Sequence, residues 1–490
     1  MKRKQEFGTL LIAVLAMMVA CGGENSRGGP HASRASSLDV VQQGCVFTEW
    51  SKPVNMGPVL NTEFDDFHPA TTANGLSLFF TSNRPGGVPG MTPNPSTIDI
   101  WVTHRACNST ACPWGPPANV TKVNSPQNDA VPNISPDGLA MYFHSGRPNL
   151  CSNPPGTFNA DLYVSYRKDP NNDFDWQTPV NLGCEPAGPN TARSENAPLF
   201  FKNTAAGREE LYFSAALPPP GPPIPGGLGG SDLMLSTRPN ATFPWSPGVL
   251  IKSLSSPQND DRTAIRQDGL EMILSSDRVG TIGGTDLWVT TRASTLVDWS
   301  TPTNLGAPLN TTFTDGGPAL SFDGKTLYFT SNRPGGFGMR DLYTTTRNDT
   351  IPPVITPNAD ANGFSATLWP PNHSMQTVSL GDCIASVVDQ CDGTLPVTAG
   401  TILHVTSDEA ANGDGSGNTA VDIVIVDGQT VQLRAERDGT GDGRVYTIFA
   451  SFGDDDGNQT PITCKVQVPH DRRGTPAIDS GAVYCVGQGC

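Results

Sequence analysis

Short apolar runs recur along the middle of this chain, and turn-forming residues precede each of them. Two of the clearest are Leu-Phe-Phe at 78–80 and Leu-Tyr-Phe at 327–329, both followed by Thr-Ser-Asn-Arg. Asn-Gly or Asp-Gly precedes four of the runs, while Gly207 stands alone in the third copy. These residues suit the positive φ angles of a tight hairpin turn. The pattern predicts short antiparallel strands joined by hairpins.

A third strand is indicated by a repeated pattern of Asp, three mostly apolar residues, two further residues and Arg. The five copies span residues 99–105, 161–167, 232–238, 286–292 and 341–347. A Trp marks a fourth strand in each repeat, and these Trp residues lie 54 to 69 positions apart: Trp50, Trp114, Trp176, Trp245 and Trp299. Four strands per repeat at this period predict the blades of a β-propeller.

The order of these strands predicts how the propeller closes. Trp50 precedes the first three-stranded unit, and no Trp strand follows the last unit, which ends at Arg347. We therefore expect the strand near Trp50 to complete the last blade, because closure removes the exposed edges of an open sheet. Five Trp strands and five units predict a five-bladed propeller over residues 46–350.

The repeat resembles that of TolB-like periplasmic proteins in two features, the Pro-Asn-Ile-Ser-Pro-Asp-Gly of residues 132–138 and the Ser-Asn-Arg strand ends. This WD-like resemblance implies a propeller in a bacterial envelope protein and leaves the activity open. The third copy departs from it, since Ala215 and Ala216 appear in place of Asn-Arg and a Pro/Gly-rich insertion follows at 218–230.

A different pattern follows residue 350. Alternating β-branched residues, for example at 421–426 and 444–448, and Gly/Asp turns predict a β-sandwich over residues 351–473. The segment resembles the Ig-like modules, similar to hyalin-type repeats, that end many bacterial surface proteins. The resemblance implies a spacer or adhesion module. Residues 474–490 are expected to form an irregular tail.

The amino terminus predicts export. Three basic residues at 2–4 precede an apolar run at 10–20, which is the pattern of a secretory signal. Met18 to Cys21 resembles a bacterial lipobox, and this implies cleavage after residue 20 and lipidation of Cys21. The alternative is an ordinary secretory signal that meets a Cys. Residues 21–45 are expected to form a flexible tether. The expected location is the cell envelope, as an outer-membrane lipoprotein facing the periplasm or the cell surface, with the lipid as its only membrane contact.

Net charge and cysteine content fit an exported protein. A formal charge of −16 argues against nucleic-acid binding. Without Cys21, ten of the eleven cysteines remain, an even number. We expect disulfides within the pairs 107/112, 485/490 and 151/184. The pairing of the other four is left open: Cys45, Cys383, Cys391 and Cys464.

One acidic residue recurs three positions before the Pro of each first strand, with Thr263 replacing Pro in the fourth copy. If that strand is innermost, the acids form a ring of carboxylates at a mouth of the channel: Asp66, Asp129, Glu195, Asp260 and Asp315. Pairing with the repeat arginines is the favoured interpretation, since a shared role in every blade is typically structural: Arg84, Arg147, Arg278 and Arg333. A cation bound by the ring is the alternative.

Three acidic turns at 412–418, 438–443 and 454–458 provide calcium candidates: Asp414, Asp438, Asp442, Asp454 and Asp456. The first two turns lack the Glu expected at the twelfth loop position, where Ile423 and Phe449 stand. Tight turns also use these residue types. No cofactor is therefore assigned, and calcium remains an alternative.

The sequence contains no Gly-x-Ser-x-Gly, His-Glu-x-x-His or phosphate-binding glycine loop. Its recurring acids follow the repeat, whereas glycoside hydrolases need two carboxylates with different roles. We therefore predict a non-catalytic, lipid-anchored binding or scaffold protein that presents a propeller face to an envelope protein or a glycan. Two alternatives are a carbohydrate-active enzyme that uses the central channel and a purely structural envelope protein.

Overall fold

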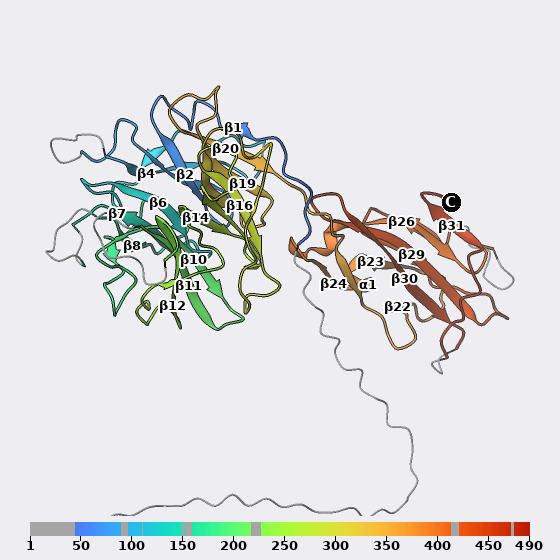
Figure 1. Ribbon diagram of the computed structural model, residues 1–490. Helices are drawn as coiled ribbons and strands as arrows, with labels where there is room; N and C mark the ends of the chain where they lie inside the picture. Colours follow the sequence, from blue (N-terminus) through green and yellow to red (C-terminus); the bar gives the residue numbers. More distant parts are fainter. Residues whose placement is uncertain are drawn as a thin grey trace, which may run out of the picture. The chain divides into compact units, whose positions relative to one another are not determined.

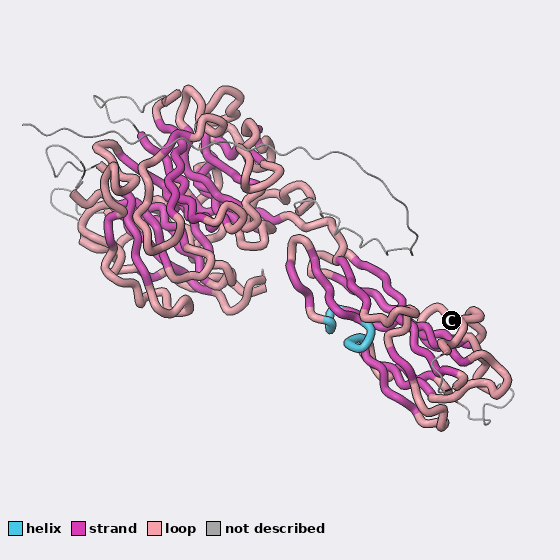
Figure 2. The backbone as a smooth tube through the Cα atoms, turned by 90° about the horizontal axis from the view of Figure 1, so that it is seen from below, coloured by secondary structure: helices cyan, strands magenta, loops and turns pink. Residues whose placement is uncertain are grey.

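The computed structural model describes residues 45–89, 97–109, 111–148, 151, 159–216, 227–412, 421–471 and 475–490. In these ranges the regular elements are β-strands apart from a one-turn helix, α1 (Leu380–Cys383), and a 3-10 helix, η1 (Val397–Ala399) (Figure 2). The all-β prediction is confirmed. No helix in these ranges is long and apolar enough to cross a membrane. The predicted signal peptide, Cys21 lipidation, most of the tether and Asp414 lie outside the described residues.

Five four-stranded antiparallel sheets form the first part of the chain (Figure 1). In each, three strands of six to ten residues come from one repeat and are completed by a two-residue outer strand. The first three sheets are β2 (Asp66–Thr71), β3 (Ser77–Ser82), β4 (Asp99–His104) and β5 (Ala118–Asn119); β6 (Asp129–Ile134), β7 (Ala140–Ser145), β8 (Asp161–Tyr166) and β9 (Val180–Asn181); and β10 (Ser194–Asn203), β11 (Arg208–Ala216), β12 (Ser231–Arg238) and β13 (Val249–Leu250).

The fourth and fifth sheets follow the same plan. They are β14 (Asp260–Ile265), β15 (Glu271–Ser276), β16 (Asp286–Thr291) and β17 (Thr303–Asn304); and β18 (Asp315–Leu320), β19 (Thr326–Ser331), β20 (Asp341–Thr346) and β1 (Val54–Asn55). The amino-terminal strand β1 pairs antiparallel with β20, with Val54 opposite Thr344. The two ends of this region therefore complete one sheet.

The first strands of the sheets contact one another in a closed cycle, β2 to β6, β10, β14, β18 and back to β2. Buried side chains of neighbouring sheets share a core; Phe79 packs with Met141 and Phe143, and all three are fully buried. Four-stranded sheets stacked around a central axis in this way define a β-propeller. The first strands line its central channel.

Each repeat Trp lies four residues before its outer strand rather than within it. A proline follows each Trp before the strand begins, and proline has no N–H to donate to a sheet. The Trp rings instead stack on the arginines that end the third strands, with guanidinium-to-ring distances of 4.1 to 4.5 Å: Arg347–Trp50, Arg105–Trp114, Arg167–Trp176, Arg238–Trp245 and Arg292–Trp299. The repeated Arg and Trp thus hold the outer strand against the sheet.

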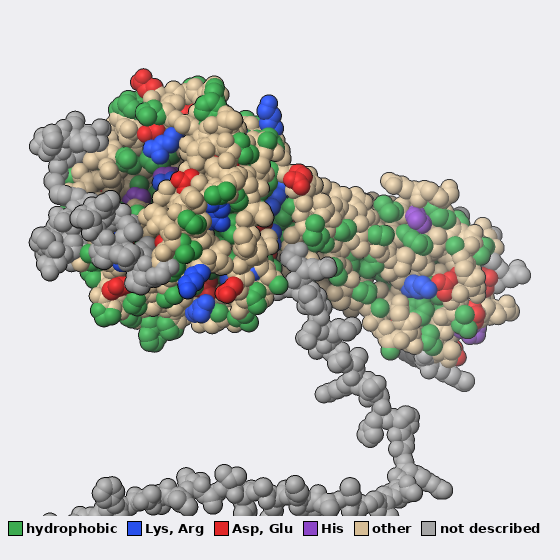
Figure 3. All heavy atoms as spheres, viewed as in Figure 1, with side chains coloured by type: hydrophobic (Ala, Val, Ile, Leu, Met, Phe, Trp, Pro, Cys, Tyr) green, Lys and Arg blue, Asp and Glu red, His purple; other side chains and the backbone are tan. Residues whose placement is uncertain are grey.

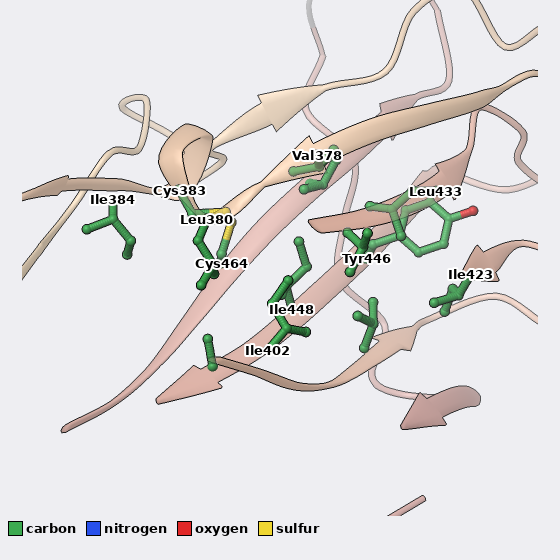
Figure 4. Close-up of a cluster of buried hydrophobic side chains, with 14 of the residues drawn as sticks. Val378, Leu380, Cys383, Ile384, Ile402, Ile423, Leu433, Tyr446, Ile448 and Cys464 are labelled. Atoms are coloured by element: carbon green, nitrogen blue, oxygen red, sulfur yellow. A yellow bond between two sulfur atoms is a disulfide. The ribbon is translucent and has the colours of Figure 1, made fainter. Parts of the chain in front are cut away.

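The carboxyl-terminal module consists of three sheets. Their strand orders are β21 (Val354–Pro357), β24 (Ile384–Asp389), β25 (Gly393–Leu395); β22 (Ala366–Thr367), β30 (Gln459–Pro469), β29 (Gly443–Gly453), β26 (Gly400–Ser407), β31 (Tyr484–Gly487); and β23 (Met375–Ser379), β28 (Thr430–Arg434), β27 (Ile423–Ile425). Val378, Leu433 and Ile448 lie in its core, and the Cys383–Cys464 disulfide joins α1 to β30 (Figure 4). The tail contributes β31, which pairs with β26.

The disulfides agree with the sequence analysis where it named pairs. Cys107–Cys112, Cys151–Cys184 and Cys485–Cys490 are bonded. Of the four cysteines left open, Cys383 and Cys464 pair, while Cys45 and Cys391 are free thiols close to each other. The Cys45 thiol donates a hydrogen bond to the Gln390 carbonyl at 3.6 Å.

We expect Cys45 and Cys391 to form a further disulfide when the protein matures in an oxidising compartment, because their thiols are already close to each other. Proteolysis without reduction, followed by mass spectrometry, should yield a cross-linked peptide that carries both residues. The Cys391→Ser variant should lose this peptide and keep the Cys107–Cys112 one. Alkylation of both thiols in the air-oxidised native protein would contradict the prediction.

Candidate functional site

A β-bulge interrupts each first strand two residues after its acid, where the pairing with the second strand breaks register. The residue at the bulge has a positive φ of 42 to 62° in every sheet: His68, Val131, Ala197, Arg262 and Gly317. Only the last is glycine, and a β-branched residue such as Val131 adopts this conformation at a cost. The same strained position therefore faces the channel axis five times.

The bulges fasten neighbouring sheets to one another. The amide of His68 donates to Thr330 Oγ1 at 3.0 Å, and that of Val131 donates to Thr81 Oγ1 at 3.0 Å. The amide of Gly317 donates to Ser275 Oγ at 2.8 Å in the same way. These acceptors stand on the second strand of the preceding sheet. At the bulge the backbone amide cannot hydrogen-bond to the second strand of its own sheet, and the side-chain hydroxyl of the preceding sheet accepts its hydrogen bond instead.

A pocket of about 330 Å³ opens among the bulges and the strand ends beyond them, and all five first strands contribute to its lining. Its wall includes Phe200 and Phe322, and amide side chains are supplied by Asn133 and Gln267. Figure 3 shows a hollow in the propeller surface in which histidine and basic side chains are visible. Within the described residues the lining contains no Asp or Glu. A concave site with apolar walls and a few polar groups is the usual form of a small-molecule site.

Arg262 is a cation in this lining. Its side chain is 31% exposed, and its guanidinium lies 3.7 Å from Asp261, which is longer than a hydrogen bond. Its Nε has no hydrogen-bond partner among the described residues. Asp261 is occupied elsewhere, since its Oδ1 accepts the Arg262 N–H at 2.8 Å and the Ser214 hydroxyl. Arg262 is thus available to an anionic group that enters the pocket.

Two histidines accompany Arg262. His68 is 4% exposed, and its Nδ1 has no partner in the described part of the chain. Burial, and then the charge of Arg262, lowers the pKa of His68 well below its usual range. Burial, and then Arg262, also lowers the pKa of His144 to about 4. Both imidazoles are therefore neutral near pH 7.

The sequence analysis assigned no chemistry to these three residues. His144 occupies the second-strand position that holds Thr81, Ser275 or Thr330 in other sheets, as the register shows. Arg262 follows the acid pair 260–261 in the copy where Thr263 replaces Pro. A comparison of residues by blade position, rather than by type, would have singled out both.

The predicted carboxylate ring lies elsewhere. Its five acids are at most 1% exposed, begin or nearly begin the first strands, and do not line the pocket. Four of them pair with the repeat arginine of the same sheet: Asp66–Arg84, Asp129–Arg147 at 2.6 Å, Asp260–Arg278 and Asp315–Arg333 at 2.6 Å. Their second oxygens accept backbone N–H groups four residues upstream, at Thr62, Ser125, Ser256 and Thr311. These acids fasten the start of each first strand.

Glu195 differs from the other four. The register sets Ala215 opposite Glu195, where Ser82 stands opposite Asp66. The Glu195 carboxylate accepts the Thr191 N–H at 3.1 Å and the Thr191 hydroxyl. Burial raises the pKa of Glu195 to about 8, and these hydrogen bonds offset the rise only in part.

The calcium candidates of the sequence analysis fall in two places. Asp438 and Asp442 belong to the turn before β29, where Asp442 is exposed. Asp454 and Asp456 belong to the turn between β29 and β30. Asp454 Oδ1 accepts the N–H groups of Asp456 and Asn458, and Asp456 pairs with Lys325 at 2.6 Å.

No protein-family model matches this chain. No curated protein matches it either. Solved structures do resemble it. They include an α-L-arabinofuranosidase from Lactobacillus brevis, with a TM-score of 0.39 and 12% identity, over 62% of this chain and 94% of that one.

Two further solved structures resemble this chain to a similar degree. A family 117 glycoside hydrolase from Zobellia galactanivorans has a TM-score of 0.40 and 12% identity over 62% of this chain and 91% of its own. The GH43 protein BlXynB from Bacillus licheniformis has a TM-score of 0.37 and 12% identity over 87% of this chain and 98% of its own.

These matches correct several predictions. These three solved structures are glycoside hydrolases, so the assignment to TolB-like lipoproteins is wrong, and so is the non-catalytic scaffold. The Ig-like assignment of the carboxyl-terminal module finds no support in the matches. The envelope-protein partner and the lipid anchor find no support in the matches. The physical reason is that the Asp-Gly turns, apolar strands and Ser-Asn-Arg ends that carried the resemblance are what a propeller blade needs to fold.

Proposed function

We propose that this chain is a carbohydrate-active protein that takes a glycan into the channel of a five-bladed propeller, and that the glycan carries a uronic acid. The observation that supports this is Arg262, an incompletely paired cation in a pocket whose described lining residues include no Asp or Glu. A guanidinium binds a carboxylate through two parallel hydrogen bonds. Phe200 and Phe322 offer apolar faces for sugar rings, and Asn133 offers an amide for hydroxyl groups.

The groups in the pocket favour one reaction class over another. Hydrolysis by a carboxylate pair needs two acids on either side of the glycosidic bond, and the described lining supplies neither. A uronic acid has an acidic C5–H next to its carboxylate. We assign the abstraction of this proton to the imidazole of His68, which lines the pocket. The imidazole takes the C5 proton, the C5–H electrons form the C4–C5 double bond, and the C4–O bond breaks with its electrons on the leaving oxygen, which a water molecule protonates.

Substrate binding would also raise the pKa of His68, the proposed base. The charge of Arg262 contributes to the low pKa of His68. A substrate carboxylate on Arg262 cancels that charge and raises the pKa of His68 toward the range in which a general base works best. His68 thus becomes a stronger base only when an acidic sugar is bound.

Titration calorimetry with uronic-acid and neutral oligosaccharides of equal length tests the binding. The acidic ligands should bind more tightly, and Arg262→Gln should weaken them about 10- to 100-fold, which corresponds to one or two charge-assisted hydrogen bonds. Neutral ligands should be unaffected, and Arg208→Gln, at an arginine that is 44% exposed, serves as the control. The appearance of an unsaturated uronate, lost in His68→Asn, tests the reaction. Equal affinity for both ligand classes would overturn the uronate assignment.

We also propose that the protein acts outside the reducing cytoplasm. Four disulfides within the described residues support this location. Glycans of cell walls and extracellular matrices are accessible there.

A further inference from the structure

Two buried carboxylates at the start of the carboxyl-terminal module are only half satisfied. Asp349 follows β20 and is 2% exposed; its Oδ1 accepts the Ile351 N–H at 2.6 Å. Asp389 ends β24 and is 1% exposed; its Oδ1 accepts the N–H groups of Cys391 and Asp392 at 2.7 and 2.8 Å. The Oδ2 atoms of both residues have no hydrogen-bond partner in the described part of the chain. A buried, unpartnered carboxylate oxygen is costly and calls for a ligand.

The surrounding donors meet at the distances a metal ion requires. Ligand atoms of Asp349, Asp389 and Cys391 lie within 4.8 Å of one another, and so do ligand oxygens of Asp349, Asp392 and Asp454. Oxygens on opposite sides of a calcium ion, each at about 2.3–2.6 Å, are about 5 Å apart. Asp349 belongs to both groups, so both groups lie around its carboxylate.

Among the described residues, basic side chains neutralise the negative charge of this cluster only at its edge. Lys325 pairs with Asp392 and, at 2.6 Å, with Asp456. Among the described residues Asp349, Asp389 and Asp454 have no ion pair with a basic side chain. Asp392 Oδ2 is a third buried carboxylate oxygen of the cluster without a hydrogen-bond partner among the described residues.

We propose that Asp349, Asp389, Asp392 and Asp454 bind one calcium ion. Four carboxylates supply the hard oxygen donors that calcium prefers. A zinc site would need the Cys391 thiolate, but this thiol lies close to that of Cys45, with which we expect it to form a disulfide. The ion joins the segment after β20 to the β24–β25 turn and the β29–β30 turn, and so fixes the start of the module. Sequence reasoning found only Asp454, because the other three ligands lie in segments without a calcium-loop pattern.

Calorimetric titration of the chelator-treated whole chain with calcium chloride tests the proposal. We expect one ion per chain, a dissociation constant below about 1 mM as in extracellular modules, and a rise in melting temperature with calcium. The Asp349→Asn/Asp389→Asn double variant should bind at least about 100-fold more weakly, since both carboxylates are ligands. Asp442→Asn, at an exposed acid in another turn, should bind as the wild type does.

Asp392→Asn provides a second variant in case the double variant does not fold, because this carboxylate is 11% exposed. It should weaken calcium binding while the far-ultraviolet circular dichroism stays that of the wild type. Three results would overturn the proposal: no heat and no thermal shift with calcium, unchanged calcium affinity in folded Asp349 or Asp392 variants, or binding of zinc without binding of calcium.

Discussion

Replacing Arg278 with alanine should lower the free energy of unfolding of the propeller by about 3–5 kcal/mol, the cost of leaving a buried charge without its partner. Asp260 is fully buried, and its Oδ1 accepts hydrogen bonds from Arg278 and, at 2.6 Å, from Ser276. Arg278 also donates to the Leu254 carbonyl at 2.6 Å and stacks on Trp288. The substitution removes the three contacts of Arg278 at once and leaves Asp260 with its Ser276 hydrogen bond.

Urea denaturation followed by tryptophan fluorescence measures the effect. Arg208→Ala is the matched control, since its pair with Glu210 is 44% exposed on the arginine side and should contribute at most about 1 kcal/mol. The Arg278→Ala/Asp260→Asn double variant should recover part of the loss, because it no longer buries an unpaired charge. A loss below about 1 kcal/mol in Arg278→Ala would show that the pair does not fasten the sheet.

Replacing Glu195 with glutamine should flatten the pH dependence of stability. Burial raises the pKa of Glu195 to about 8 in the folded chain, against about 4.5 when unfolded. The folded state therefore binds more protons between these values, and its stability falls as pH rises through this window. The loss is complete above pH 8 and amounts to several kcal/mol, on the order of 1.4 per unit of pKa difference. Glutamine carries no charge, so the variant avoids this loss.

Unfolding free energies measured from pH 4 to pH 9 test this expectation. The wild type should lose stability relative to Glu195→Gln above about pH 5, with the difference greatest above pH 8. Glu63→Gln, at an exposed glutamate, should follow the wild-type curve. Parallel curves for the wild type and Glu195→Gln would mean that burial does not raise the pKa of Glu195 in the folded chain.

Local patterns in the sequence were enough to predict much of the propeller. Strand alternation, Asp-Gly turns and the repeated Trp predicted sheets of four strands, and the missing Trp strand after Arg347 predicted the pairing of β1 with β20. In four of the five repeats the acid also pairs with the repeat arginine as the favoured interpretation held, for example Asp129 with Arg147. These features recur from repeat to repeat, so a single sequence shows each pattern several times.

The functional interpretation failed for the same reason. Repeated residues such as Asp66 or Trp114 hold blades together, and they carried the resemblance to TolB-like proteins. Two residues near the channel axis break the repeat: Arg262, at a bulge in the pocket lining, and His144, at a hydroxyl position next to the Ala197 bulge. In a single sequence a break in a repeat looks like ordinary variation, and only the closed ring brings such residues to one axis.

The sequence by itself thus determined the strands, the turns, the outer-strand closure and the buried ion pairs, because each depends on residues within one repeat or on the order of the repeats. Only the tertiary structure decided which side chains share a space. Asp349, Asp389 and Asp454 are separated by 40 and 65 residues, and their ligand oxygens nevertheless lie in two groups within 4.8 Å that share Asp349. His68 and Arg262 come from different sheets and line the same pocket. Long-range contacts of this kind depend on how the sheets pack, and no local pattern records them.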